Sequence, residues 1–176
     1  MKPYQLVPCI TEAEIANRLD GLAARLNADY RGQDLLVIGI LKGACIFLSD
    51  LVRRLEMPVQ IDFVRLASYG QKDSSSGTVA ITKDIELPVE GRHVLVVEDI
   101  VDTGLTLAWY LDYLKKLQPT SVKTCAMIDK KERREVEVVL DYVGIGVAGG
   151  FLVGYGLDFA EKHRNLPAIY EVKFEE

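Results

Sequence analysis

The sequence has little of what disulfide scaffolds and zinc sites need. Its 176 residues include only three cysteines and two histidines. The cysteines, Cys9, Cys45 and Cys125, are odd in number and far apart, so they match neither a disulfide framework nor the paired spacing of a zinc site. A disulfide-stapled domain and a zinc-binding module are therefore disfavoured, and a reducing, cytoplasmic setting is expected.

The sequence also lacks an excess of positive charge and a long apolar segment. Lys and Arg number 21 against 26 Asp and Glu, a formal net charge of −5, so no global positive field attracts a polyanion. The longest uncharged run lies between Asp141 and Asp158; glycines interrupt it, and it is shorter than the ~20 residues of a spanning helix. The first residues do not have the pattern of a secretory signal. We therefore expect no nucleic-acid partner, no membrane association and no export.

Enough apolar residues are present for one packed domain. Hydrophobic residues make up 49% of the chain and charged residues 27%, and this length suits a single domain. The sequence shows no internal repeat, low-complexity tract or linker. Residues 1–176 are therefore predicted to form one domain.

Short apolar runs alternate with segments of helical periodicity. Thr11 and Glu14 have the spacing of a capping box, and apolar residues then recur at helical spacing as far as Leu26. Runs rich in β-branched residues predict strands buried on both faces. The alternation predicts an α/β fold with a mainly parallel twisted sheet flanked by helices, whose ligands bind beyond the carboxyl ends of the strands. The predicted strands are 35–40, 59–66, 93–97, 122–128 and 136–142, the predicted helices 11–26, 44–55 and 103–117, and the predicted long loop 67–84.

The strongest local signal is segment 94–106, which reads VLVVEDIVDTGLT. A buried strand runs into the acids Glu98, Asp99 and Asp102, and then into a Thr-Gly-x-Thr turn that opens a helix. The amide N–H groups of such a turn, together with the threonine hydroxyls, suit a phosphate. Acids beside a phosphate pocket accept hydrogen bonds from sugar hydroxyls, hold Mg²⁺ or take a proton. The alternative is that Asp102 only caps the helix while the other two acids are solvated.

This segment closely resembles the phosphoribosyl pyrophosphate signature of the type I phosphoribosyltransferases, and more narrowly that of the hypoxanthine-guanine phosphoribosyltransferases. The resemblance covers nearly the whole chain in the family's order and implies the family's fold, with a small hood formed by the terminal segments. The other matching segments are Leu41-Lys42-Gly43 (pyrophosphate loop, whose first peptide can be cis in the family), Ser68-Tyr69-Gly70 (flexible catalytic loop), Lys130 (purine-reading lysine), Phe151 to Asp158 (base pocket) and Arg164-Asn165-Leu166-Pro167.

The resemblance implies a role for each acid of segment 94–106. Glu98 and Asp99 would hold the ribose hydroxyls and, partly through water, Mg²⁺, while Asp158 would help to bind a second Mg²⁺. Asp102 would be the catalytic residue that acts on the purine N7 proton. Phosphoribosyl pyrophosphate would be bound by Lys42, Gly43, Glu98, Asp99, Asp102, Thr103, Gly104, Leu105, Thr106 and Arg164, and metal by Glu98, Asp99 and Asp158.

The resemblance also implies a purine site. Lys130 would donate to the 6-oxo group of the base, although its charged neighbours alone favour a solvated turn. Phe151 would stack on the purine, Leu152 would read the base edge through its backbone, and Asp158 would lie beside them. Ser68 and Tyr69 would belong to the flexible loop. The pair Gly149-Gly150, just before the pocket, departs from the bulkier and often charged residues that the family has there.

The implied activity is purine salvage, in which the phosphoribosyl group passes from phosphoribosyl pyrophosphate to hypoxanthine or guanine in a homodimer or homotetramer. Two alternatives stay open: a xanthine-preferring enzyme, and a nucleotide-sensing regulator that binds RNA through the same fold. The acidic charge balance opposes the second. A dinucleotide fingerprint of the form G-x-G-x-x-G spans residues 144–149, but little chain remains for the helix and acid-ended strand that should follow it.

Overall fold

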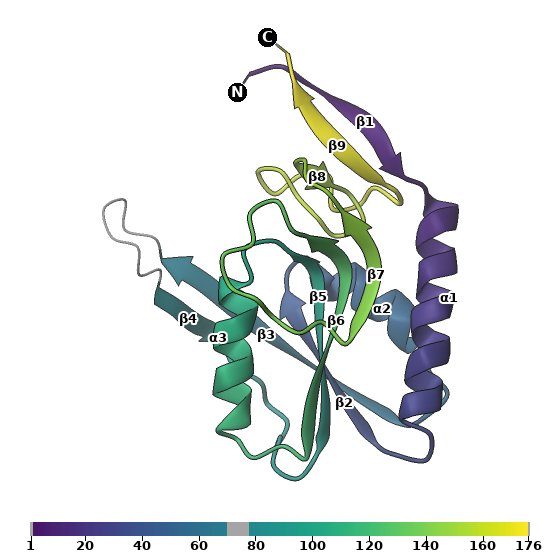
Figure 1. Ribbon diagram of the computed structural model, residues 1–176, viewed down its shortest axis with the longest axis vertical. Helices are drawn as coiled ribbons and strands as arrows, with labels where there is room; N and C mark the ends of the chain where they lie inside the picture. Colours follow the sequence, from purple (N-terminus) through teal and green to yellow (C-terminus); the bar gives the residue numbers. More distant parts are fainter. Residues whose placement is uncertain (1, 70–77, 176) are drawn as a thin grey trace.

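The computed structural model describes residues 2–69 and 78–175 (Figure 1). A six-stranded sheet has the order β4-β3-β2-β5-β6-β7, and a three-stranded sheet has the order β1-β9-β8. In the larger sheet only the β3–β4 pair is antiparallel among the described strands. The predicted α/β fold with a mainly parallel sheet is therefore confirmed. The elements are β1 (Tyr4–Ile10), α1 (Glu12–Asp29), β2 (Leu35–Leu41), α2 (Ala44–Val52), β3 (Val59–Tyr69), β4 (Thr78–Lys83), β5 (His93–Val101), α3 (Leu105–Lys115), β6 (Ser121–Lys130), β7 (Tyr142–Val147), β8 (Leu152–Val153) and β9 (Ile169–Phe174).

Strand β2 shows how one apolar run serves two layers of helices. All of its residues except the last are buried. Leu35 and Val37 pack in a cluster with α1 and α2, whereas Leu36 and Ile38 pack in a second cluster with α3. Successive strand side chains point to opposite faces of a sheet. Helices α1 and α2 therefore cover one face and α3 covers the other (Figure 1).

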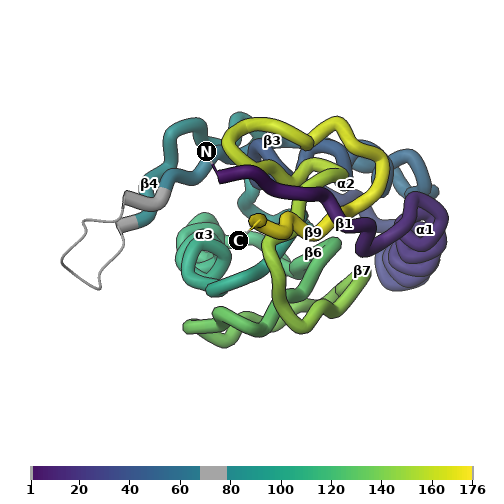
Figure 2. The backbone as a smooth tube through the Cα atoms, turned by 90° about the horizontal axis from the view of Figure 1, so that it is seen from above, coloured from purple at the N-terminus to yellow at the C-terminus, as the bar shows by residue number. Residues whose placement is uncertain are grey.

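The two ends of the chain form the small hood (β1, β8 and β9). Strands β1 and β9 pair antiparallel from Tyr4 opposite Phe174 to Ile10 opposite Ile169, and β8 adds to β9. In Figure 1 the hood lies beyond the ends to which the arrows of β5, β6 and β7 point, and Figure 2 looks down onto it. The predicted hood of terminal segments is confirmed, and it lies at the edge of the sheet where a ligand is expected.

The strand predicted over 136–142 is wrong. Residues 136–141 join no sheet within the described part of the chain, and strand β7 begins only at Tyr142. The Thr124 hydroxyl donates to the Val139 carbonyl (2.8 Å) and accepts from the Asp141 N–H (3.1 Å), and the Asp141 carboxylate accepts from the Thr124 N–H (2.9 Å). These side-chain bonds replace a backbone ladder. The glycines of the false dinucleotide fingerprint then fall partly within β7.

The loop predicted over 67–84 is also wrong in part. Strand β3 continues to Tyr69, and β4 pairs with it antiparallel, with Tyr69 opposite Thr78 and Arg65 opposite Lys83. The sequence signal in β4 is the alternation of Val79 and Ile81 with smaller residues, which the serine-rich stretch beside it obscured. Residues 70–77 of the predicted flexible loop lie outside the described part of the chain.

Candidate active site

Strand β5 carries the acid-rich segment to the sheet edge where α3 begins. Gly104 caps α3 with a φ of 83°, and a Cβ at this position would lie 2.3 Å from the Val136 carbonyl oxygen. Only glycine accepts both the left-handed backbone and this close approach. The turn borders a cavity of about 140 Å³ lined in part by Glu98, Asp102, Thr103, Gly104 and Thr106. Five of the predicted phosphoribosyl pyrophosphate-binding residues thus converge at this cavity, whereas Leu105 does not line it and has an exposed side chain.

The protein alone stabilises the ionised forms of Glu98 and Asp99 poorly. Oε2 of Glu98 is enclosed and has no hydrogen-bond partner among the described residues. Burial, helped by the charge of Asp99, raises the pKa of Glu98 well above its ordinary value. Burial also raises the pKa of Asp99 to about 6, against the opposing N–H of Ile100 and the charge of Arg164. Both carboxylates would gain from a hydroxyl donor or a cation.

The turn between β2 and α2 meets these acids directly. The Leu41–Lys42 peptide is cis, as the resemblance allows. A Cβ on Gly43 would lie 1.7 Å from Oδ2 of Asp99, and a Cβ on Gly156 would lie 2.2 Å from the Gly43 carbonyl oxygen. Two glycines therefore let three separate segments of the predicted site come into contact.

Lys130 is not the solvated surface charge that its neighbours in sequence suggest. Its side chain is 8% exposed, and its Nζ lies 3.0 Å from Oδ2 of Asp102 and 3.3 Å from the carbonyl oxygen of Gly150. Oδ1 of Asp102 is enclosed and has no hydrogen-bond partner within the described residues. Asp102 is not the N-terminal cap of α3, because Gly104 occupies that position. The alternative role of Asp102 as a helix cap is therefore wrong. A cleft of about 220 Å³ beside the ion pair is lined by Asp99, Ile100, Asp102, Lys130, Arg133, Phe151, Leu152, Leu157 and Asp158.

The predicted stacking ring, Phe151, packs edge-to-face against an aromatic cluster that includes residues of the hood. Phe151 is 45% exposed, and the ring of Phe159 meets it at a centroid distance of 5.3 Å and an interplanar angle of 78°. Phe159 in turn makes edge contacts with Tyr4 of β1 and Phe174 of β9. Such edge-to-face packing fixes an aromatic ring without covering both of its faces. The terminal strands therefore support the wall of the base cleft.

Sequence reasoning missed Arg134. Its buried guanidinium donates to the carbonyl oxygens of Asp102 (2.8 Å) and Val101 (3.1 Å) and forms an ion pair with Asp129. It therefore fixes the backbone of the loop that carries Asp102. No sequence signal distinguishes Arg134 from its charged neighbours, because the interpretation of 129–134 as a solvated run fits all of them equally.

Sequence reasoning also missed Glu161. Its Oε2 lies 2.8 Å from the Lys42 Nζ and its Oε1 lies 3.5 Å from NH2 of Arg164. Arg164 also pairs with Asp158 at 2.7 Å and donates to the Gly156 carbonyl at 2.7 Å. The loop after the base cleft thus brings two acids onto the cations predicted to bind pyrophosphate.

The predicted metal ligands are not gathered into one cluster, and most of the predicted flexible loop lies outside the described residues. No three His, Cys, Asp or Glu side chains within residues 2–69 and 78–175 are gathered as a metal site. Of the predicted ligands, Asp99 and Asp158 line the base cleft and Glu98 lines the phosphate cavity. Ser68 and Tyr69 are at the end of β3, and the rest of the predicted flexible loop is outside the described residues.

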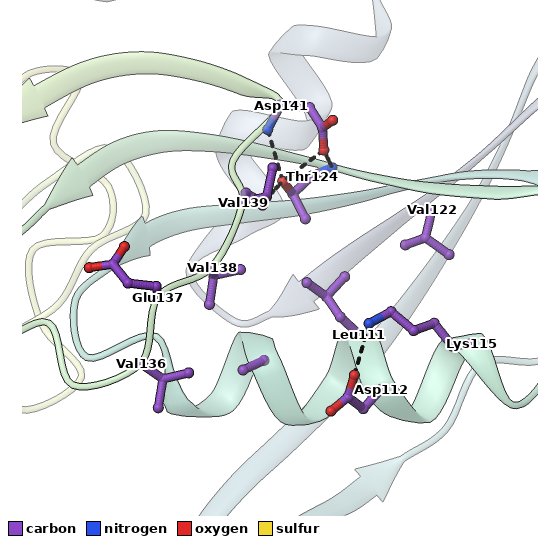
Figure 3. A pocket seen from close by; sticks show the side chains of 11 residues that line it. Leu111, Asp112, Lys115, Val122, Thr124, Val136, Glu137, Val138, Val139 and Asp141 are labelled. Carbon is purple, nitrogen blue, oxygen red and sulfur yellow. Dashed lines mark hydrogen bonds and ion pairs between the residues drawn. The ribbon is translucent and has the colours of Figure 1, made fainter.

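A further cavity of about 450 Å³ lies between α3 and the segment 136–141 (Figure 3). None of the predicted site residues that the structure describes lines it. Lys115 contacts Asp112 at 2.9 Å, Asp141 bonds with Thr124, and the remaining charged residue of the described lining, Glu137, is an acid. Valines provide much of the remaining wall. This cavity offers a phosphate no free cation within its described lining, so the chemistry belongs to the two smaller spaces.

Comparisons with known proteins agree with this geometry. Residues 10–160 match the family model described as phosphoribosyl transferase domain. The chain is 46% identical over 165 residues to the hypoxanthine-guanine phosphoribosyltransferase of Aquifex aeolicus, covering 93% of each chain. It is 46% identical over 160 residues to the bifunctional protein TilS/HprT of Listeria monocytogenes, covering 91% of this chain and 25% of that one. A hypoxanthine-guanine phosphoribosyltransferase structure from Bacillus anthracis superposes with a TM-score of 0.91 at 38% identity, covering 97% of this chain and 99% of that one.

The chain therefore belongs to the phosphoribosyltransferase family. Within the family, its similarity is to the hypoxanthine-guanine phosphoribosyltransferases, as the sequence motifs indicate. The structure also has no helix in its described residues that is long and apolar enough to cross a membrane.

Proposed function

We propose that this protein transfers the phosphoribosyl group of phosphoribosyl pyrophosphate to hypoxanthine or guanine in purine salvage, releasing pyrophosphate and inosine or guanosine monophosphate. The observation that carries the proposal is the position of Asp102, which lines both the phosphate cavity and the base cleft. A carboxylate at this junction can reach a purine while the adjacent turn holds the 5′-phosphate. The names of the similar proteins support the same activity.

The phosphate cavity positions the ribosyl group. The N–H groups at the start of α3 and the hydroxyls of Thr103 and Thr106 hold the 5′-phosphate, with Gly104 and Leu105 contributing backbone. Glu98 and Asp99 accept hydrogen bonds from the ribose hydroxyls. These bonds compensate for the lost hydration that raises the pKa of both acids. The sugar is thus held at both ends, and C1 faces the base cleft.

The base cleft supplies the proton chemistry. The Lys130 ammonium donates to the 6-oxo group, Leu152 bonds the base edge through its backbone, and Phe151 stacks on the ring. Purine N9 attacks C1 as the bond from C1 to pyrophosphate breaks, and Asp102 accepts the proton that N7 loses. The ion pair with Lys130 holds the carboxylate in position for this transfer.

The leaving group needs its charge neutralised, because pyrophosphate carries away the electron pair of the broken bond. Lys42 and Arg164 provide two cations beside Gly43 and Asp158, and the Gly43 and Gly156 backbones bring these segments together. Preorganised cations of this kind stabilise a transition state in which charge develops.

We further propose Mg²⁺ as the cofactor, held by Glu98 and Asp99, partly through water, with Asp158 helping to bind a second Mg²⁺. Hard oxygen donors suit Mg²⁺, and it commonly takes only one or two carboxylates together with water and substrate phosphates, so a gathered protein cage is not required. When bound, Mg²⁺ would neutralise charge on the pyrophosphate. Oε2 of Glu98, which is enclosed and without a hydrogen-bond partner among the described residues, and the raised pKa of Asp99 support a cation here.

Metal removal should therefore suppress turnover. We expect an excess of chelator to lower the hypoxanthine kcat/KM at least about 100-fold, since charge neutralisation by metal contributes several kcal/mol, and added Mg²⁺ should restore it. The measurement is initial rates with phosphoribosyl pyrophosphate before and after chelation. Unchanged rates in excess chelator would remove the metal from the mechanism.

A panel of free bases tests the proposed activity itself. Hypoxanthine, guanine, xanthine and adenine are each incubated with phosphoribosyl pyrophosphate and Mg²⁺, and nucleotide formation is measured. We expect hypoxanthine and guanine to be used and adenine to be rejected. Preferential use of xanthine would favour the alternative enzyme, and no transfer with any base would favour a nucleotide-sensing regulator.

The remaining parts of the proposal concern the whole molecule. One phosphoribosyltransferase domain spanning 1–176 is supported by the core cluster that joins Ile10, Leu152 and Ile169 of the hood to α1 and α2. We propose a homodimer or homotetramer in the cytoplasm, with the purine base and phosphoribosyl pyrophosphate as small-molecule partners and without nucleic acid or membrane. Sedimentation of the purified protein would measure the oligomeric state.

A further inference from the structure

The carboxylate of Glu161 bridges the two cations that the proposed reaction assigns to pyrophosphate. It lies 2.8 Å from the Lys42 Nζ and 3.5 Å from NH2 of Arg164, and its two oxygens divide between the two cations. We propose that Glu161 is an internal competitor of pyrophosphate, which occupies Lys42 and Arg164 between turnovers and weakens the binding of diphosphate ligands so that product leaves. This inference rests on the proposed function, because that function makes pyrophosphate the ligand of these cations.

The loop holds Glu161 in a backbone conformation that side chains rarely adopt. Ala160, Glu161 and His163 have φ values of 52°, 63° and 75°. Each such residue costs free energy and persists only where the surroundings enforce it, commonly at functional sites. The Glu161 N–H donates to Oδ2 of Asp158 at 2.9 Å, which fixes the backbone. The backbone of the loop therefore places Glu161 where its carboxylate reaches Lys42.

The contact is suited to displacement. The side chains of Lys42 and Glu161 are 47% and 65% exposed, so water and ions reach the pair, and exposed ion pairs are weak. A diphosphate carries more charge than one carboxylate and can replace it on both cations.

The two possible roles of Glu161, competition and positioning, predict opposite changes in pyrophosphate affinity when its charge is removed. If Glu161 served only to position Lys42 for substrate, removing its charge would weaken the binding of pyrophosphate. If Glu161 competes, removing its charge releases Lys42 and leaves Arg164 facing only the carboxylate of Asp158. It also removes a carboxylate that repels the ligand, so the binding of pyrophosphate becomes tighter. A surface ion pair without function would change binding in neither direction.

The test is the affinity of inorganic pyrophosphate for the full chain, measured by calorimetry with Mg²⁺ and without a purine. We expect Glu161→Gln to lower the Kd about fivefold, the scale of an exposed ion pair, and the effect to shrink at high salt because screening weakens exposed charges. Glu161→Asn is the second variant, since asparagine accepts a positive φ well. Glu56→Gln, which removes one exposed negative charge outside the proposed site, is the matched control and should leave the Kd unchanged.

Steady-state kinetics provide the second readout. In Glu161→Gln the KM for phosphoribosyl pyrophosphate should fall together with the Kd of pyrophosphate, while the KM for hypoxanthine should stay constant. An equal or higher Kd in both Glu161 variants, a matching decrease in Glu56→Gln, or no pyrophosphate binding by any of these proteins would overturn the proposal. Tighter pyrophosphate binding in a protein that transfers to no purine would instead reject the proposed function and retain the competition.

Discussion

Asp102→Asn should lower kcat with hypoxanthine by about 10²–10⁴-fold, because a positioned general base contributes on this scale. The amide keeps the shape of the side chain and can still accept a hydrogen bond from Lys130, but it cannot take the N7 proton. Initial rates at saturating phosphoribosyl pyrophosphate would measure the loss. The KM for hypoxanthine should change much less than kcat, since the contacts of the base with Phe151 and Leu152 remain.

Folding must be separated from catalysis in this variant. Lys130 is nearly buried and loses its charged partner, and removal of one member of a buried pair is destabilising. Thermal unfolding of Asp102→Asn therefore accompanies the kinetics, with Asp112→Asn, an exposed acid on α3 paired only with Lys115 among the described residues, as the matched control. Near wild-type turnover in a folded Asp102→Asn would exclude the general base.

The layers of the fold could be predicted because they depend on local patterns. The run from Leu35 to Ile40 is apolar at every position, so it belongs inside a parallel sheet whichever helices cover it. The order of strands and helices then follows from alternation along the chain. The segment 136–142 is also rich in β-branched and apolar residues. However, the hydroxyl of Thr124, which is distant in sequence, bonds two of its backbone groups. A pattern confined to the segment cannot reveal that competition.

The site also has parts that local sequence patterns predict and parts that depend on contacts distant in sequence. Segment 98–106 is contiguous, so its acids, glycine and threonines are enough to predict a phosphate-binding turn. The ion pair of Asp102 with Lys130 and the bridge from Glu161 to Lys42 join residues far apart in sequence. Burial also cannot be judged within a charged run, and Lys130 and Arg134 are enclosed while Lys131 is exposed. The resemblance to the family identified Lys130, whereas nothing in the sequence identified Arg134 or Glu161.

Base choice gives the second large effect. The Lys130 ammonium is held by Asp102 and by the Gly150 carbonyl at the rim of the base cleft, so it presents a donor and no acceptor to the purine 6-position. A 6-oxo group accepts this hydrogen bond and the 6-amino group of adenine cannot. A buried donor left unpaired discriminates by about 10⁴, so the wild-type kcat/KM for adenine should lie about that far below the value for hypoxanthine.

Lys130→Gln should reduce this discrimination mainly by losing the oxopurines. A hydrogen bond to a charged group contributes about 1.5–3 kcal/mol, so we expect the hypoxanthine kcat/KM to fall about 10–100-fold while the rate with adenine stays low. Lys131→Gln is the matched control, because its side chain is 77% exposed and its neighbour in sequence carries the proposed contact. The measurement is kcat/KM for both bases in all three proteins. If Lys130→Gln retained the wild-type value for hypoxanthine, or wild type used the two bases equally, Lys130 would serve only to hold Asp102 in place.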